Sequence, residues 1–276
     1  MADRDPGITL QKPDPLILAG LVLYGPRWKA ALARALGVSR ETVSRWVSSA
    51  EVPEWASHAA HLMSTAKGSV LSLCDRTTHM LRPWAEAGFE CFALDAAHAT
   101  DPQRGSDGIT RIGADVRSWL PPPRRYAMVF AFPPCTNLAV SGARWFREKG
   151  MGGLTEALEI VEACRRICDW SEAPWMIENP VSTLGSYWRK PDFTFHPYEF
   201  GGWQGGEKDD YPKRTCLWTG GGFRFPQKRP IDAFRPLYIH NMPPGPERAE
   251  IRSVTPHGFA RAVFEANVGR GHDLPS

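Results

Sequence analysis

A thiol held rigidly at the end of an apolar run is the feature of this sequence best suited to covalent chemistry. Residues 126–132 form a short apolar run typical of a buried strand, and Pro133-Pro134-Cys135 follows directly. Each proline fixes its own φ angle and restricts the residue before it, so the loop that carries the thiol is stiff. We expect Cys135 to be presented as a nucleophile, although a chance Pro-Pro-Cys turn would look the same.

Acidic and basic groups stand at the ends of other strand-like runs. Glu178-Asn179-Pro180 ends the run that begins at residue 175, and a carboxylic acid there could protonate or hydrogen-bond a ring nitrogen of a bound base. Lys213-Arg214 precedes a further apolar run. Taken alone, Glu-Asn-Pro usually marks a turn, so its meaning depends on what surrounds it.

Two aspartates are candidates for holding a nucleotide-like cofactor. Asp95 ends the strand-like run 89–94, and one carboxylate there can accept from both hydroxyls of a ribose. Asp115 could accept from an adenine amino group. Turn or capping roles fit both equally well. The loop after the first run, which begins Leu73-Cys74-Asp75, lacks the glycines that usually allow close approach to a nucleotide.

The elements that must position these groups alternate between strands and helices. Strand-like runs at 70–74, 89–94, 109–112, 126–132 and 175–177 are separated by helical patterns, among them 80–87 and 154–170. This alternation predicts an α/β fold with a doubly wound, mostly parallel sheet. In such sheets ligands gather at the carboxyl ends of the strands. The residues expected there are Asp75, Asp95, Asp115, Cys135 and Glu178.

Residues 17–66 have a different pattern, made of short helices. A helix at 28–36 ends at Gly37, and Ser39 can cap the next helix. The spacing of Ala33, Gly37 and Val43 is typical of a helix-turn-helix, in which the second helix enters the major groove of DNA. The residues that would face DNA are Arg40, Thr42, Ser44 and Arg45. A small helical bundle that serves only for packing is the alternative.

The bulk composition places few limits on function. The chain has 276 residues and a net charge of +3, so a DNA-binding face must come from local clusters of Lys and Arg. No apolar run is long enough to cross a membrane and no signal pattern opens the chain, which predicts a cytoplasmic protein. The six cysteines show no zinc-ligand spacing, so we expect no metal site and a reduced, reactive Cys135.

In this order the motifs resemble those of the cytosine C5 DNA methyltransferases, in islands spread over residues 69–265. Pro133-Pro134-Cys135 with Ser141-Gly142 is similar to the family's nucleophile loop, and Glu178-Asn179 to its Glu-Asn pair. Lys213-Arg214 lies where the family has Gln-x-Arg, without the glutamine. Residues 252–261 are similar to its late Arg-x-x-Thr-Pro helix. The nucleophile loop and the Glu-Asn pair are the specific part of the likeness.

The resemblance implies a fold of the S-adenosylmethionine-dependent methyltransferase type and transfer of a methyl group to C5 of cytosine in DNA. Cys135 would add to C6 of a base flipped out of the duplex, Glu178 would donate to N3, and Arg214 would hold the O2 edge or a phosphate. It implies that S-adenosylmethionine is bound by Leu73, Cys74, Asp75, Asp95, Asp115 and Pro133. DNA contacts from Ser141 and Arg144 would join those of the helix-turn-helix.

Departures from the family pattern shape the predicted organisation. About thirty residues separate Trp218 from Arg252, too few for a full target-recognition region, so the helix-turn-helix is expected to supply DNA affinity. The predicted domains are a flexible lead-in (1–16), the helix-turn-helix module (17–66) and the catalytic domain (67–276). Such a compact enzyme would suit a phage or prophage. Residues 149–153, rich in glycine, form either a mobile segment that closes over the base or a plain surface turn.

Two alternatives stay open. The same addition chemistry could serve another donated group, or RNA or a nucleotide as substrate, and the glycine-free loop keeps that possibility alive. A different class is a non-catalytic DNA-binding regulator on a degenerate methyltransferase fold. Methylation of an exocyclic amine is disfavoured, because Phe132 stands where those enzymes have Asp or Asn before Pro-Pro.

Overall fold

The computed structural model describes residues 16, 17, 20, 28–49, 51–65, 68–232 and 254–268, with the side chains of 61–65 outside the description. The described residues divide between 66 and 67 into two compact units. Most of the predicted lead-in, together with Arg252 and Ser253 of the late motif, lies outside the described residues. None of the described helices is long and apolar enough to cross a membrane.

The described residues of the first unit include three helices that pack around a small core. They are α2 (Trp28–Leu36), α3 (Arg40–Ser49) and α4 (Glu54–Thr65). Gly37 has a φ of +69°, the left-handed conformation that ends α2, and the hydroxyl of Ser39 accepts a hydrogen bond from the Thr42 amide at 3.1 Å. The turn and the cap that the sequence predicts are therefore both present.

The side chains of α3 separate into two faces. Val43 is fully buried and packs in one cluster with Ala33 of α2, the pair whose spacing predicted the turn. Arg40 and Arg45 are exposed, while Thr42 and Ser44 are half-buried. The predicted DNA-contacting side chains therefore lie outside the apolar face of α3, and it is the apolar face that packs into the core.

The second unit is built on an eight-stranded sheet of order β3-β4-β2-β1-β5-β6-β8-β7. Its central strands β4, β2, β1, β5 and β6 run parallel, and β8 is antiparallel to both β6 and β7. The short edge strand β3 is antiparallel to β4, so β3 and β8 are the reversed strands. From β4 to β7, the order with β8 reversed is that of the S-adenosylmethionine-dependent methyltransferase fold. The strands are β1 (Ser69–Leu73), β2 (Glu90–Leu94), β3 (Gln103–Arg104), β4 (Ile109–Ile112), β5 (Tyr126–Ala131), β6 (Trp175–Pro180), β7 (Phe193–Phe195) and β8 (Thr215–Gly220).

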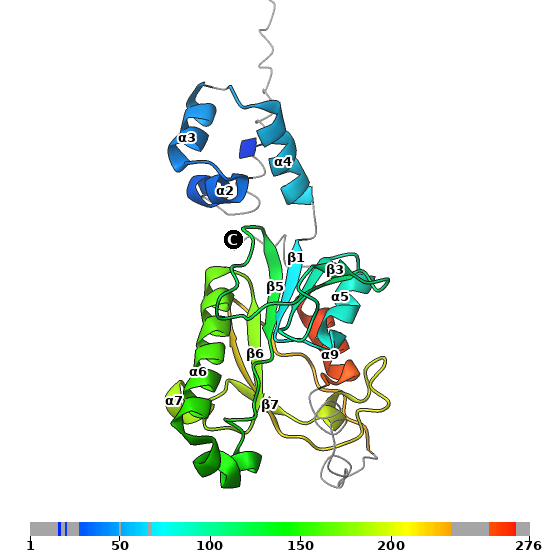
Figure 1. The fold of residues 1–276 in the computed structure, drawn as a ribbon. Helices are drawn as coiled ribbons and strands as arrows, with labels where there is room; N and C mark the ends of the chain where they lie inside the picture. Colours follow the sequence, from blue (N-terminus) through cyan, green and yellow to red (C-terminus); the bar gives the residue numbers. More distant parts are fainter. Residues whose placement is uncertain are drawn as a thin grey trace, which may run out of the picture. The chain divides into compact units, whose positions relative to one another are not determined.

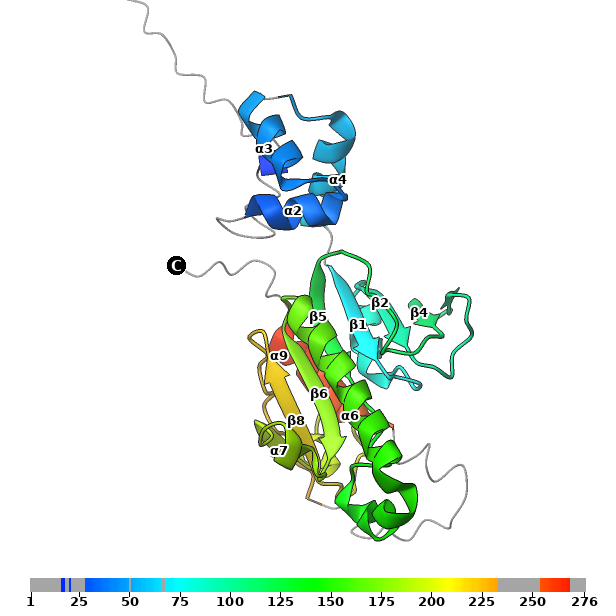
Figure 2. The ribbon, with the colours of Figure 1, turned by 60° about the vertical axis from the view of Figure 1, so that its left-hand side comes forward.

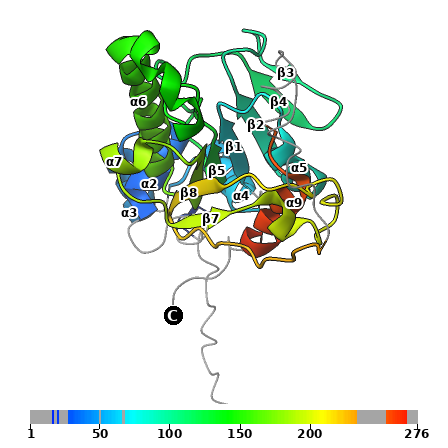
Figure 3. The ribbon, with the colours of Figure 1, turned by 90° about the horizontal axis from the view of Figure 1, so that it is seen from below.

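Helices cover both faces of this sheet, as the alternating side chains of its strands require. Leu71 and Leu73 of β1 pack in the cluster that contains the buried face of α6 (Phe146–Trp170). Val70, on the opposite face of the same strand, packs in a cluster with α5 (Arg82–Glu86) and α9 (His257–Asn267). Figures 1, 2 and 3 show α6 on one side of the sheet and α5 with α9 on the other. The predicted doubly wound α/β fold is confirmed.

Three segments differ from the sequence prediction. An additional helical segment from Phe146 precedes the helix expected at 154–170, and residues 149–153, each exposed or half-buried, hold the break between the two parts of α6. Gly150 interrupts that helix with a φ of 64° and a ψ of −172°. The helix expected at 80–87 is split into the 3-10 turn η2 (His79–Leu81) and α5. The three-residue strand β7 escaped prediction because it is too short to show a period.

Candidate active site

Cys135 lies in a tight turn just beyond the carboxyl end of β5. Its carbonyl oxygen accepts hydrogen bonds from the amides of Leu138 and Ala139, at 2.9 and 2.8 Å. The side chain is half-buried and forms no disulfide. Backbone bonds from Val140 to Val181 and from Thr183 to Leu138 tie this turn to the segment that follows β6. The thiol is therefore carried on a loop that is braced from the neighbouring strand.

Asn179 supplies the second brace. Its side chain is fully buried, and its Nδ2 donates to the carbonyl oxygen of Pro133 at 3.0 Å. Its Oδ1 is buried with no hydrogen-bond partner. One amide thus fixes the first proline of the Pro-Pro-Cys loop from the adjacent strand and keeps an acceptor unused.

Glu178 lies at the same edge of the sheet as Cys135. The pairing of β5 with β6 ends at Ala131 and Ile177. The strand expected to end at Ile177 continues to Pro180, so Glu178 lies within β6, one residue past the last β5 pair and opposite Leu217 of β8. The Oε1 of Glu178 is buried without a hydrogen-bond partner. Burial raises the pKa of this carboxyl above its ordinary value of 4.5, and the positive charge of Lys213 opposes that shift. A protonated carboxyl with an unused oxygen can donate a hydrogen bond to a ligand.

Lys213 and Arg214 reach this edge through the reversed strand β8. Pro180 at the end of β6 pairs with Thr215 at the start of β8, so the residues before Thr215 lie beside the end of β6. Arg214 is exposed, and Lys213 is half-buried and close enough to Glu178 to influence its pKa. Sequence reasoning gave the chemical role to Arg214 alone. The effect of the Lys213 charge on the pKa of Glu178 depends on how β6 pairs with β8, and the composition of the sequence does not reveal that pairing.

The loop after β1 adopts its conformation without glycine. Cys74 has a φ of 54° and Thr78 a φ of 60°, left-handed values that are uncommon for non-glycine residues and strained for a β-branched one. Cys74 is half-buried, and its Sγ lies 3.9 Å from the Sγ of Cys164 in α6. The backbone conformation usually supplied by glycine is thus present at two positions of the predicted cofactor loop.

Asp75 holds that loop together from within. Its carboxylate is buried and accepts from the Ser72 hydroxyl and from the Thr78 amide, each at 2.7 Å. Burial raises its pKa, and these hydrogen bonds counteract the rise. The structure places the Asp75 side chain among internal bonds, so a cofactor contact from this residue falls to its backbone or its neighbours.

Asp95 and Asp115 lie beyond β2 and β4 in different electrostatic settings. Asp95 is half-buried, and its Oδ1 accepts from the Ala97 amide at 2.8 Å. The carboxylate of Asp115 is held by the guanidinium of Arg117 through both of its oxygens. That ion pair lowers the pKa of Asp115. Leu73, at the end of β1, is fully buried and can act only through its backbone.

The predicted DNA-facing residues of the nucleophile segment are exposed. Ser141 and Arg144 lie in the 3-10 helix η3 (Val140–Trp145), and the guanidinium of Arg144 stacks over the Trp145 ring at 5.0 Å. Among the described residues no group of His, Cys, Asp and Glu has the arrangement of a metal site.

Comparisons with known proteins add little to this geometry. No protein-family model and no curated protein matches the chain. A solved structure described as a DNA modification methyltransferase encoded within an E. coli prophage aligns at 11% identity and a TM-score of 0.35, over 55% of this chain and 46% of that one. The glycopeptide N-methyltransferase MtfA aligns at 14% identity and a TM-score of 0.23, over 81% and 78%. Similarity this low supports no assignment, so the fold rests on its strand order.

Proposed function

We propose that this protein transfers a methyl group from S-adenosylmethionine to C5 of cytosine in DNA, through a covalent bond between Cys135 and C6 of a flipped base. One observation carries the proposal. A braced thiol on the loop after β5 and a buried carboxyl with an unused oxygen, one residue past the last β5–β6 pair, both lie at the edge where such sheets bind ligands.

The chemistry requires those two groups to act together. Addition of the Cys135 thiolate forms the S–C6 bond and pushes an electron pair toward N3, where the protonated Glu178 donates. C5 thereby becomes nucleophilic. S-adenosylmethionine, when bound, would supply the methyl group that C5 accepts, with S-adenosylhomocysteine as the leaving group. Transfer of the C5 proton to water then restores the C5–C6 double bond, breaks the S–C6 bond and returns the thiolate of Cys135, while N3 gives its proton back to Glu178.

The raised pKa of Glu178 is the physical requirement for that role. An ionised carboxylate would repel the lone pair of N3, whereas a protonated one donates to it. The positive charge of Lys213 acts in the opposite direction and lowers the pKa of Glu178. Asn179 acts as a positioning residue, because it holds the Pro133 carbonyl and so the path of the loop to Cys135.

The cofactor loops fit S-adenosylmethionine in part. The left-handed residues Cys74 and Thr78 shape a loop that lets backbone face a ligand, and Asp95 keeps a half-exposed carboxylate for ribose hydroxyls. Asp115 would have to share its carboxylate with Arg117 to accept from an adenine amine. In this proposal the cofactor lies over β1 and β2, and the target base lies at β5 and β6.

DNA affinity is assigned to the first unit, acting with the exposed Ser141 and Arg144. The positively charged side chains of α3 point away from the core and can reach phosphates or base edges. Replacing Arg40 and Arg45 by Ala should weaken DNA binding and flatten its salt dependence, while cofactor binding is unchanged. An unchanged affinity at several salt concentrations would exclude α3 as the DNA-contacting helix.

The decisive experiment follows labelled methyl from S-adenosylmethionine into mixed-sequence DNA, with nucleoside analysis of the product. We expect label in 5-methylcytosine with the wild type and none with Cys135→Ala. Label in RNA or in free nucleotides would redirect the proposal to those substrates. Absence of transfer by wild type that binds both DNA and the cofactor would favour a regulator or another donated group.

A further inference from the structure

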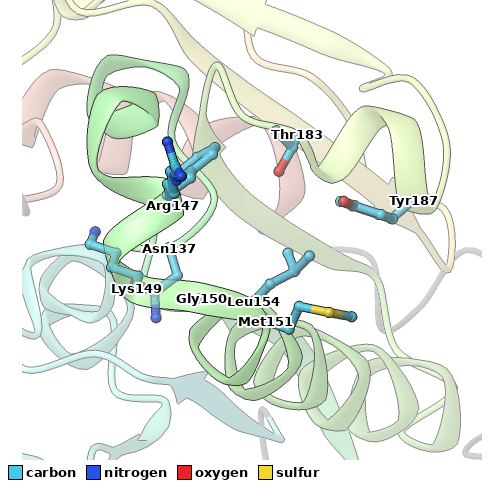
Figure 4. Close-up of a pocket in the computed structure, with 9 residues that line it drawn as sticks. Asn137, Arg147, Lys149, Gly150, Met151, Leu154, Thr183 and Tyr187 are labelled. Carbon is cyan, nitrogen blue, oxygen red and sulfur yellow. The ribbon is translucent and has the colours of Figure 1, made fainter.

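A cavity of about 420 Å³ lies beside the nucleophile loop and has no part in the proposed chemistry. It is formed by the loop after β5, the start of α6 and the segment from β6 through α7 (Leu184–Tyr187). All three meet at the carboxyl edge of the sheet, on the side covered by α6, as Figure 4 shows. Its volume is within the ~300–1,000 Å³ of typical small-ligand sites.

The side chains that line the cavity combine flat apolar walls with hydrogen-bonding and positively charged groups. Phe146, Leu154 and Tyr187 supply the apolar surface, and Tyr187 is 56% exposed. Arg147 contributes a cation. The Asn137 amide and the Thr183 hydroxyl, which faces the cavity in Figure 4, offer donors and acceptors. Aromatic surface, a cation and an amide are what a nucleotide needs for its base, its phosphate and its base edge.

Two contacts join the residues around this cavity to the loop that carries Cys135. The ammonium of Lys149 donates to the carbonyl oxygen of Thr136, the residue directly after Cys135. Gly153 packs so closely on Asn137 that an added Cβ would lie 3.3 Å from its amide nitrogen. Asn137 is two residues from Cys135, hence at most about 7.6 Å away between Cα atoms. With about 3.4 Å of rise per nucleotide, that span corresponds to one or two steps along a DNA strand.

The kink at Gly150 shapes the open side of the cavity. The break in α6 turns Met151 outward, where its side chain is 83% exposed. An exposed methionine beside an aromatic wall is a surface that a flat base can cover without displacing buried groups. Gly150 and Met151 both line the cavity, and a Cβ added at Gly150 would meet no atom within 4 Å, so the cavity is open at the kink.

We propose that this cavity binds the nucleotide next to the target cytosine on the same DNA strand, with its base against Tyr187 and its phosphate at Arg147. This inference rests on the proposed function, because it extends the substrate of the same site by one nucleotide. It assigns part of the sequence preference of the protein to the cavity. A second nucleotide held there would also keep the strand extended while the cytosine lies at Cys135.

The test compares Tyr187→Ala and Arg147→Ala with Arg166→Ala, which removes an exposed arginine from the far part of the same helix. The probe for binding is a fluorescein-labelled single-stranded oligonucleotide of mixed sequence. We expect Tyr187→Ala to weaken its affinity roughly tenfold to a hundredfold, the effect of losing one base–aromatic stack, and Tyr187→Phe to restore most of it. Arg166→Ala should bind as the wild type does.

A second readout separates this inference from the proposed function. Sequencing of the cytosines methylated by wild type should show a preference at the neighbouring position, and Tyr187→Ala should lose that preference while Arg166→Ala keeps it. Wild type that methylates DNA, together with two variants that keep its neighbour preference and its affinity for the oligonucleotide, would overturn the cavity assignment and leave the proposed function in place. If wild type transfers no methyl group, weakened oligonucleotide binding by Tyr187→Ala still supports the cavity, and unchanged binding overturns it.

Discussion

The two ligand-binding regions proposed at the carboxyl edge of the sheet differ in how their polar groups are satisfied. Around β5 and β6, Glu178 and Asn179 each have a buried oxygen without a hydrogen-bond partner. Around β1, β2 and β4, the carboxylates of Asp75 and Asp115 already accept hydrogen bonds from donors within the protein. Because an unsatisfied buried polar atom is costly, a ligand that completed these two oxygens would relieve that cost. The Nδ1 of His79, after the β1 loop, is also buried without a partner, so the difference concerns the carboxyl and amide groups. Under the proposed function, a ligand would complete such groups in the nucleophile region more than in the cofactor region.

The largest effect expected of any substitution is that of Cys135→Ala. Removal of the sulfur leaves no group that can form the bond to C6, so methyl transfer should become undetectable while DNA and cofactor binding persist. The matched control is Cys168→Ala, which deletes a buried thiol in α6 and should lower stability but leave transfer intact. Equal loss of activity in both variants would show that the effect of Cys135→Ala is structural.

Glu178→Gln should change activity and stability in opposite directions. Loss of the acidic proton should slow methyl transfer roughly 10²-fold or more. Because burial raises the pKa of Glu178, the folded chain binds its proton more tightly than the unfolded chain does. The contribution of Glu178 to stability is then greatest at low pH and is lost as pH rises through the folded pKa, a loss that the neutral Gln avoids.

The measurement is a set of melting temperatures for wild type and Glu178→Gln from pH 4 upward, alongside the rates. We expect Gln to melt higher than wild type at neutral pH and the two curves to converge toward acid. A variant that is both slower and less stable at neutral pH would contradict a raised pKa at this position.

Asn179→Leu tests the brace that the two loops share. The substitution leaves the Pro133 carbonyl without its donor, and should cost about 1–3 kcal/mol of stability. It should also slow transfer roughly tenfold to a hundredfold, because small displacements of a reacting group reduce rates strongly. Asn267→Leu is the control: it breaks buried bonds to Arg224 and Val263 in α9, so it should destabilise the fold without altering the rate of the folded protein.

The sequence predicted the strands that position this site better than it predicted the charges and hydrogen bonds within the site. Apolar runs located β1, β2, β4, β5 and the start of β6, because buried strands need such residues whatever surrounds them. The left-handed φ of Cys74 could not be foreseen, since its residue type argues against that conformation. The Asp75 and Asp115 carboxylates are directed by side chains two or three residues away, and the charge of Lys213 on Glu178 comes from strand register. The Lys213 effect depends on tertiary strand pairing, and the bonds of Asp75 and Asp115 depend on local conformations that the residue types alone do not specify.

The smallest effect separates the two aspartates of the cofactor region. Asp95→Asn should weaken S-adenosylmethionine binding about tenfold, because a hydrogen bond to a charged acceptor is lost with little compensation. Asp115→Asn should weaken it less, since Arg117 already occupies that carboxylate and must be shared for a ligand to gain from it. Calorimetric titration of both variants gives the order directly. If Asp115→Asn proves the more damaging, the ion pair with Arg117 must open on binding, and the cofactor region would join the nucleophile region in holding groups that a ligand completes.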